Sequence, residues 1–406
     1  MTINSDQELK QSRNNIGSAE NARWASTFGA SMTDISVLFK PIRNRTIRQL
    51  VPLAFGGSAV RLTLSNLFST EALQIDAASV MLADEYNRPA TGSRRDLTFA
   101  GAAAVELARG SEITSDPVEI VVPANSVLIV DLFVAGAGLI TTGTLSTAVQ
   151  VSLSEPGDHR GNPGMAFINQ RPLNIGSATL PPPMLLLRRV DVLADSAKHA
   201  FVAFGDSLTQ MGTWPGHLCK RLAAADNNNW SLINAGISGN RIIHDAASGP
   251  MAGLFGPSGI NRFNKDALDY AAVNAVAIFM GINDLTYPGT LALPGEIVTA
   301  EDMIAGLSGM AVRARAAGVR AIGCTILPFT GADDIPSAAE AKRRDVNSWI
   351  RLTSQFDAIF DFDRVLADPQ HPEQLRAEYD SGDHLHPNDA GGLAMAAAID
   401  LELFNL

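Results

Sequence analysis

Residues 200–209 read AFVAFGDSLT, a short apolar run that becomes polar directly after Gly205. A run of this length that ends on glycine predicts a buried strand followed by a turn. Three more apolar runs of similar length follow along the chain, at Ser231–Ala235, Ala275–Met280 and Ala321–Ile326. The C-terminal half is therefore expected to contain a series of buried strands.

Helical patterns separate these strands. They cover Leu218–Ala225, Arg262–Tyr270, Glu301–Ala317, Ala338–Phe356 and the alanine-rich end Asp389–Phe404. Strands that alternate with helices form a parallel sheet with helices on both faces. We therefore predict an α/β domain with a flavodoxin-like sheet of about five strands over residues 196–406.

The N-terminal half has a different rhythm. Val60–Ser65 alternates apolar and polar residues, as a half-buried strand does. Further short runs of this kind lie near Ile47–Leu53, Leu73–Ala83, Asp96–Ala100, Val118–Val122, Val127–Val134 and Ala148–Leu153. Many short strands without long helices predict an antiparallel β-sandwich domain over residues 21–155. Polar residues 1–20 are expected to form a flexible N-terminus. Residues 156–195 are expected to form a linker or long loop, because the stretch from Glu155 to Pro183 is rich in Pro, Gly and Asn.

Composition narrows the classes of function. The chain has 406 residues and a net charge of -11, which argues against nucleic-acid binding. We find no apolar run long enough to predict a membrane span. The first residues, MTINSDQELKQSRNN, lack the features of a secretory signal, so we expect a cytoplasmic protein, or a secreted one if a leader was removed. Cys219 and Cys324 are expected to be buried, unpaired thiols.

Four polar segments follow the predicted strands or precede the last helix. They are Phe204–Thr209, Asn234–Arg241, Met280–Leu285 and Asp383–Pro387. In open α/β sheets, sites form beyond the carboxyl ends of the strands. These segments are therefore expected to meet at one rim of the sheet.

The residue types in these segments suit ester cleavage. Ser207 can serve as nucleophile, His386 as its base, and Asp383 as the group that orients His386. The backbone N–H groups of Ser207 and Gly239 and the side-chain amide of Asn283 can stabilise an oxyanion. Taken singly, each segment also fits a helix cap, a tight turn or an Asx loop. The prediction therefore depends on the occurrence of all four in order.

The four segments resemble the sequence blocks of the SGNH hydrolase superfamily, also called GDSL esterases. The matching residues are Gly205-Asp206-Ser207-Leu208, Gly236-Ile237-Ser238-Gly239-Asn240, Gly281-Ile282-Asn283-Asp284 and Asp383-His384-Leu385-His386. The resemblance implies Ser207 as nucleophile, Gly239 and Asn283 as oxyanion donors, and Asp383 and His386 as the remaining catalytic pair. It implies no metal and no cofactor. The N-terminal half is similar to the β domain that precedes the hydrolase domain in some bacterial esterases of this superfamily.

This resemblance leads to an expected function, with alternatives. We expect a serine esterase that hydrolyses short-chain, acetyl-type carboxylic esters through an acyl-Ser207 intermediate, with small-molecule or carbohydrate esters as substrates. A thioesterase or an acyltransferase would use the same triad. A protein of another class, a non-catalytic binding module, could share the fold. The sequence leaves the oligomeric state open.

Other candidate residues fit less well. His384 lies two residues too early for the superfamily pattern and is expected to pack or to line the pocket. Asp206 is expected to hydrogen-bond within its own loop. The remaining histidines show no metal-ligand spacing: His159, His199, His217, His244 and His371. Gly253–Gly259 is glycine-rich but does not continue as a phosphate-binding loop would.

Overall fold

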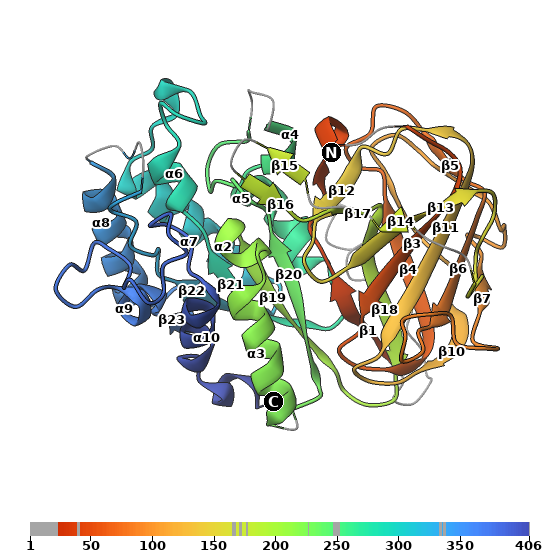
Figure 1. Cartoon of the computed structure of the whole chain (residues 1–406). Coiled ribbons are helices and arrows are strands. Elements are labelled where there is room, and N and C mark those ends of the chain that lie inside the picture. The colour runs from red at the N-terminus through yellow and green to blue at the C-terminus, as the bar shows by residue number, and fades with distance from the viewer. Residues whose placement is uncertain are drawn as a thin grey trace, which may run out of the picture.

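The computed structural model describes residues 23–38, 41–164, 168–169, 173–175, 178–225, 227–246, 252–332, 335 and 338–405. The predicted flexible N-terminus, residues 1–20, lies outside the described residues. Figure 1 shows two parts side by side, an N-terminal part built from strands and a C-terminal part of strands and helices.

The C-terminal part is built on a parallel sheet of five strands. The strands are β19 (His199–Gly205), β20 (Trp230–Gly236), β21 (Val273–Phe279), β22 (Arg320–Cys324) and β23 (Ala358–Phe360). Their spatial order is β20-β19-β21-β22-β23, and every neighbouring pair is parallel. In chain order this is 2-1-3-4-5, the flavodoxin-like arrangement. The predicted fold class of this half is confirmed.

Helices cover this sheet on both faces, which is why the apolar run Ala200–Phe204 is fully buried. The helices of the C-terminal part are α2 (Ser207–Gln210), α3 (Thr213–Ala224), α4 (Ala252–Phe255), α5 (Gly259–Phe263) with a π-helical continuation (Asn264–Leu268), α6 (Ile282–Thr286), α7 (Ala300–Ala316), α8 (Ala339–Leu352), α9 (Phe362–Leu366) and α10 (Asp389–Ala397). Helix α3 packs against α10 on one face, and α7 packs against α5 and α8 on the other. None of the described helices combines the length and the apolar composition needed to cross a membrane.

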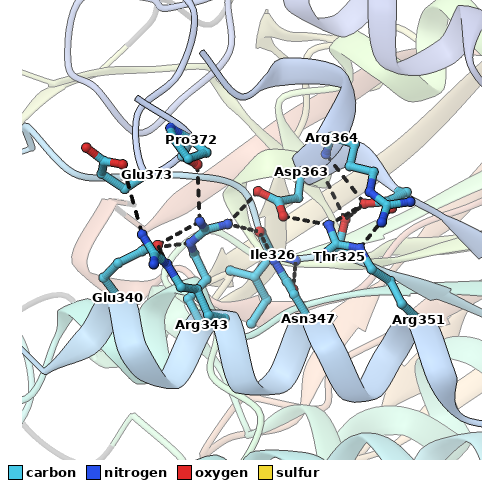
Figure 2. Close-up of polar contacts among 12 residues, drawn as sticks. Thr325, Ile326, Glu340, Arg343, Asn347, Arg351, Asp363, Arg364, Pro372 and Glu373 are labelled. Carbon is cyan, nitrogen blue, oxygen red and sulfur yellow. Dashed lines mark hydrogen bonds and ion pairs between the residues drawn. The ribbon is translucent and has the colours of Figure 1, made fainter. Parts of the chain in front are cut away.

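Helix α8 is attached to the sheet through polar side chains (Figure 2). Arg343, nearly fully buried, donates to the Ile326 carbonyl at 3.1 Å and to Asp363 at 2.5 Å. The Asn347 amide accepts from the Ile326 N–H at 2.7 Å and donates to its carbonyl at 2.8 Å. Arg351 binds Asp363 at 2.6 Å. Breaking a buried ion pair typically costs about 3–5 kcal/mol, so these contacts fix the segments that follow β22 and β23.

The N-terminal part consists of antiparallel strands. One sheet has the order β1-β18-β4-β10, with β9 also paired to β4, and a second has the order β14-β13-β3-β11-β6-β7. A smaller sheet has the order β17-β12-β2, and β5 pairs with β8 and β15 with β16. The strands are β1 (Arg23–Gly29), β2 (Thr33–Asp34), β3 (Ile42–Pro52), β4 (Gly57–Ser65), β5 (Leu73–Ile75), β6 (Ala77–Leu82), β7 (Arg95–Leu97), β8 (Val105–Leu107), β9 (Glu112–Thr114), β10 (Val118–Val122), β11 (Val127–Gly138), β12 (Thr142–Leu145), β13 (Gln150–Pro156), β14 (Ile168–Asn169), β15 (Leu173–Ile175), β16 (Ala178–Leu180), β17 (Pro183–Leu185) and β18 (Leu187–Ala194). The two larger sheets share one hydrophobic core, to which β4 and β18 contribute from one side and β3 and β11 from the other.

Strand β18 lies in the range 156–195, which the sequence predicts as a linker or long loop. It pairs with β1 and with β4 inside the N-terminal sheet. The strand contains charged residues, which interrupt the apolar pattern of a buried strand. Their partners are distant in sequence, so the local sequence does not show that they are paired. Asp191 accepts from Ser26 at 2.6 Å, and the buried Arg188 pairs with Asp269 at 3.2 Å.

The two parts meet along β20. This strand is at the edge of the parallel sheet, and β1 and the chain after it cover it: Ala30 forms a parallel bridge with Asn234, and the Ser231 hydroxyl donates to the Ser26 carbonyl at 2.6 Å. Gly29 allows this approach, since a Cβ there would lie 2.4 Å from the Tyr270 ring. A cavity of about 560 Å³ remains between the parts, and Cys219 is among its lining residues. Cys219 is exposed, so its predicted burial is wrong, while Cys324 is buried. The side chain at 219 faces this cavity rather than a packed core.

Candidate active site

The structure brings together the side chains of Ser207, His386 and Asp383. Ser207 is the first residue of α2, directly after the carboxyl end of β19. Its Oγ lies 2.9 Å from Nε2 of His386, and Nδ1 of the same ring lies 2.7 Å from Oδ2 of Asp383. With the Nδ1 proton donated to Asp383, Nε2 is free to accept the proton of the Ser207 hydroxyl. This is the geometry that a serine nucleophile and its base require.

Hydrogen bonds keep Asp383 ionised. Its Oδ1 accepts from the N–H groups of Leu385 at 3.0 Å and His386 at 2.8 Å, and from the Ser381 hydroxyl at 3.0 Å. Partial burial opposes ionisation, but the bonds from the ring and N–H of His386 outweigh it and hold the pKa of Asp383 below its usual range. The carboxylate can therefore orient His386 and stabilise the imidazolium that forms when it accepts a proton.

Asp206 shapes the turn that presents Ser207. Its Oδ1 accepts from the Leu208 N–H at 3.0 Å and caps α2, as expected for a residue that hydrogen-bonds its own loop. Its Oδ2 is buried and has no partner among the described residues. Burial raises the pKa of Asp206 to about 7. Gly205 permits the tight turn, because a Cβ there would lie 2.6 Å from the Phe279 carbonyl oxygen.

The expected oxyanion donors lie at the ends of neighbouring strands. Gly239 has a φ of 75°, and a Cβ there would lie 2.2 Å from the Phe255 ring, so only glycine fits. The backbone N–H groups of Ser207 and Gly239 make no hydrogen bond to any described residue, which leaves them available to a ligand. Asn283 is buried, and its Nδ2 donates to the Asn240 carbonyl at 2.9 Å. One amide hydrogen of Asn283 thus holds the glycine loop.

Asp284 ties the same loop to α6. Its carboxylate accepts from the N–H groups of Ile242 at 2.7 Å and Ile243 at 3.2 Å. Burial raises the pKa of Asp284 to about 6, although these two hydrogen bonds oppose the shift. The loop after β20 and the segment after β21 therefore hold each other in place.

Residues 203–392 match the family model of the GDSL-like Lipase/Acylhydrolase family. These residues form a GDSL-like lipase/acylhydrolase domain. The expected resemblance is confirmed for this half of the chain, and the family is one of hydrolases. No curated protein sequence gives a significant match to the chain.

Several solved structures are similar to the GDSL domain. A GDSL-like lipase from Bacteroides thetaiotaomicron is 19% identical, with 51% of this chain and 87% of that chain covered and a TM-score of 0.37. An alpha/beta hydrolase enzyme from the metagenome of Lake Arreo, Spain, is 22% identical, with 52% and 96% covered and a TM-score of 0.39. An acetyl xylan esterase from Geobacillus stearothermophilus is 18% identical, with 51% and 94% covered and a TM-score of 0.38. The family assignment comes from the family model and not from these distant similarities.

A second histidine–aspartate pair lies beside the first in the GDSL domain. His384 Nδ1 lies 2.6 Å from Asp380 Oδ2, and its N–H donates to Asp380 Oδ1 at 3.0 Å. His384 has a φ of 60° and a half-exposed side chain beside Gly331, and it makes no hydrogen bond to Ser207. His386, and not His384, therefore reaches the candidate nucleophile.

Two other histidines of the C-terminal part make hydrogen bonds away from Ser207. His217 pairs with Asp389 at 2.8 Å and His199 with Asn274 at 2.9 Å. Among the described residues, no group of three or more His, Cys, Asp or Glu side chains is arranged to hold a metal ion.

Two residues at the site were not predicted from the sequence. Gln210, at the end of α2, binds Ser238, and Arg262 of α5 binds Asn240 and the Gly205 carbonyl. Both side chains are buried. Neither residue type marks a function by itself, and their partners lie 22 or more residues away, so no local signal could have identified them.

Proposed function

We propose that this chain is a serine esterase that hydrolyses short-chain, acetyl-type carboxylic esters. The observation that carries the proposal is the contact of Ser207 Oγ with His386 Nε2 at 2.9 Å. On the other side of the same imidazole ring, Nδ1 lies 2.7 Å from Asp383 Oδ2. The GDSL family match supports a hydrolase. Ser207, His386 and Asp383 form the proposed catalytic triad.

The proposed reaction has two halves. Ser207 Oγ attacks the ester carbonyl carbon while His386 Nε2 takes the hydroxyl proton, and the carbonyl oxygen becomes an oxyanion. The N–H groups of Ser207 and Gly239 and the amide of Asn283 donate to that oxyanion. The intermediate collapses, the C–O bond to the alcohol breaks, and the alcohol leaves with the proton from His386. Water, deprotonated by His386, then attacks the acyl-serine and releases the carboxylic acid and Ser207.

A panel of three substrates tests this proposal. The purified protein should release p-nitrophenol from p-nitrophenyl acetate, and acetate from a peracetylated sugar. Faster turnover of an acetyl thioester would indicate the thioesterase alternative, and transfer of acetyl to an added alcohol the acyltransferase. No turnover of any of the three, together with no labelling of Ser207 by a fluorophosphonate, would indicate a binding module.

A further inference from the structure

Gly239, whose N–H is a proposed oxyanion donor, lies between two residues that are each held by a buried side chain. Gln210 holds Ser238 on one side, and Arg262 holds Asn240 on the other. Both Gln210 and Arg262 also bind residues of the N-terminal part of the chain. The position of the Gly239 N–H is thus connected to the N-terminal part by two separate routes.

The first route runs through Gln210. Its Oε1 accepts from the Ser238 N–H at 2.8 Å and from the Ser238 hydroxyl at 2.6 Å. Its Nε2 donates to the Thr144 hydroxyl and to the Leu145 carbonyl, both at 3.2 Å and both in strand β12. Because the Gln210 side chain is buried and both its amide oxygen and its amide nitrogen are hydrogen-bonded, it has one favoured orientation. Gln210 also lies on α2, the helix that begins at Ser207.

The second route runs through the buried guanidinium of Arg262. Nε donates to Asn240 Oδ1 at 2.8 Å, and Nη2 to the Gly205 carbonyl at 2.7 Å. Nη1 donates to the Ala235 carbonyl at 2.9 Å and to the Ser31 hydroxyl at 3.2 Å, and Asp266 supplies a counter-charge at 3.2 Å. One rigid group therefore fixes the end of β19, the end of β20 and the loop after β20 relative to Ser31.

The Asn240 side chain extends the second route. Its Nδ2 donates to the carbonyls of Phe255 and Pro257, both at 2.7 Å, and the backbone carbonyl of Asn240 accepts from Asn283. Phe255 in turn lies against Gly239, where a Cβ could not fit. Displacement of Asn240 would therefore disturb Gly239 and Asn283, two of the three proposed oxyanion donors.

We propose that the N-terminal strand-rich part positions the oxyanion loop, residues 236–240, through Gln210 and Arg262. Both are positioning residues, because neither needs to touch the substrate. The inference rests on the proposed function, since it concerns donors that act on a developing oxyanion. Such donors work only when they are held in place before the reaction, so a small displacement lowers kcat. The N-terminal part is then a component of the catalytic unit.

The first variant in the test changes only residues of the N-terminal part. Thr144→Val and Ser31→Ala together remove the two hydroxyls that contact Gln210 and Arg262, and leave the GDSL domain unaltered. Thr63→Val is the matched control, because the buried Thr63 hydroxyl bonds to Thr114 within the same N-terminal part at 2.9 Å. Gln210→Met, which keeps the side-chain length and loses the polar contacts, supplies a second variant if the double variant does not fold.

Three measurements are made on full-length proteins that have wild-type circular dichroism. We expect kcat for p-nitrophenyl acetate to fall about 10-fold in the double variant and about 10²-fold in Gln210→Met, with KM changed less than about 2-fold. The affinity for a phenylboronic acid, which forms a tetrahedral anion on the serine, should fall by the same factor as kcat. Amide hydrogen exchange of the peptide covering residues 236–243 should be faster, because the Ser238 N–H is held by Gln210.

The outcomes separate this inference from the proposed function. Unchanged exchange in the peptide, an unchanged kcat, or losses equal to those of Thr63→Val would overturn the positioning role. A rise in KM alone would also overturn it, since that would indicate substrate contact. If the wild type hydrolyses no ester, the proposed function fails, and the exchange measurement still decides whether the N-terminal part holds the loop.

Discussion

Asp383 binds His386 twice, through Oδ1 to the backbone N–H at 2.8 Å and through Oδ2 to Nδ1 at 2.7 Å. Asp380 binds His384 in the same manner, at 3.0 Å and 2.6 Å. The chain therefore carries two successive aspartate–histidine clamps of almost equal geometry. Only the ring of His386 lies against Ser207 Oγ, and this single contact separates the proposed base from its neighbour.

Ser207→Ala should abolish ester hydrolysis while the fold survives. Loss of the nucleophile of a triad typically costs about 10⁶ in turnover. The substitution removes one oxygen at the start of α2, whose cap is supplied by Asp206, so the helix should persist. The measurement is p-nitrophenyl acetate turnover with the melting temperature as control. A variant that keeps more than a few per cent of the wild-type rate would remove Ser207 from the proposed role.

The two clamped histidines should differ strongly on substitution. His386→Ala should be nearly as damaging as Ser207→Ala, because no other described base contacts the Ser207 hydroxyl. His384→Ala, its matched control, removes an equivalent clamp and should cost far less. The reverse ranking of the two variants would make His384 the base.

Much of the GDSL domain could be predicted from sequence for a physical reason. Strands β19 and β21 are covered on both faces, and such strands appear as uninterrupted apolar runs. Strand β18 shows no such uninterrupted run, because it carries Arg188 and Asp191, whose charges are neutralised by Asp269 and Arg61, 81 and 130 residues away. Pairing of that range cannot be inferred from local composition.

The candidate site shows the same division. Ser207, Gly239, Asn283, Asp383 and His386 could be proposed because each stands in a short segment that resembles a known block. Gln210 and Arg262 could not, since glutamine and arginine are ordinary in amphipathic helices. Their proposed positioning role depends on hydrogen bonds to Thr144 and Ser31, which the fold brings beside them.

Asn283→Ala should lower kcat by roughly 10²–10³ with a smaller change in KM, because an oxyanion donor acts mainly in the transition state. The structure adds a second effect. Asn283 also donates to the buried Asn240 carbonyl, and an unsatisfied buried acceptor costs about 1–3 kcal/mol, so the melting temperature should fall as well. Steady-state kinetics below the variant's own melting temperature separate the two effects. An unchanged kcat would exclude Asn283 from the oxyanion site.

Asp206→Asn should change how stability depends on pH. Burial raises the pKa of Asp206 to about 7 in the folded protein, whereas an unfolded aspartate has a pKa of about 3.9. The folded state binds the proton more tightly, so the stability that this carboxyl contributes is present in full below pH about 4 and is lost as the pH rises through about 7. Asparagine does not ionise and keeps an oxygen for the Leu208 N–H. The melting temperature of the variant relative to wild type should therefore increase from pH 5 to pH 8.5, and a constant difference would contradict the raised pKa.

Substrate size gives the last prediction: kcat/KM should fall as the acyl chain of a p-nitrophenyl ester lengthens from two carbons. The sequence basis is that the segments expected at the rim, Met211–Pro215, Asp245–Gly259 and Leu285–Pro294, are dominated by small residues. Trp214 and Leu254 are buried in the two cores and offer no surface to an acyl chain.

The Phe255 ring supplies a structural reason for the same limit. It covers Gly239 and contacts the Tyr287 ring, with the two ring centres 5.7 Å apart, directly beside a proposed oxyanion donor. We expect Phe255→Ala to create space beside Gly239 and to increase the preferred acyl chain length. Each additional buried methylene of the acyl chain contributes about 0.8 kcal/mol to the binding free energy. Met211→Ala is the control, because Met211 follows α2 but is exposed and has no part in this packing. A wild-type maximum at eight or more carbons would instead favour a lipase, with the exposed Leu291, Leu293 and Ile297 after α6 as the surface to examine first.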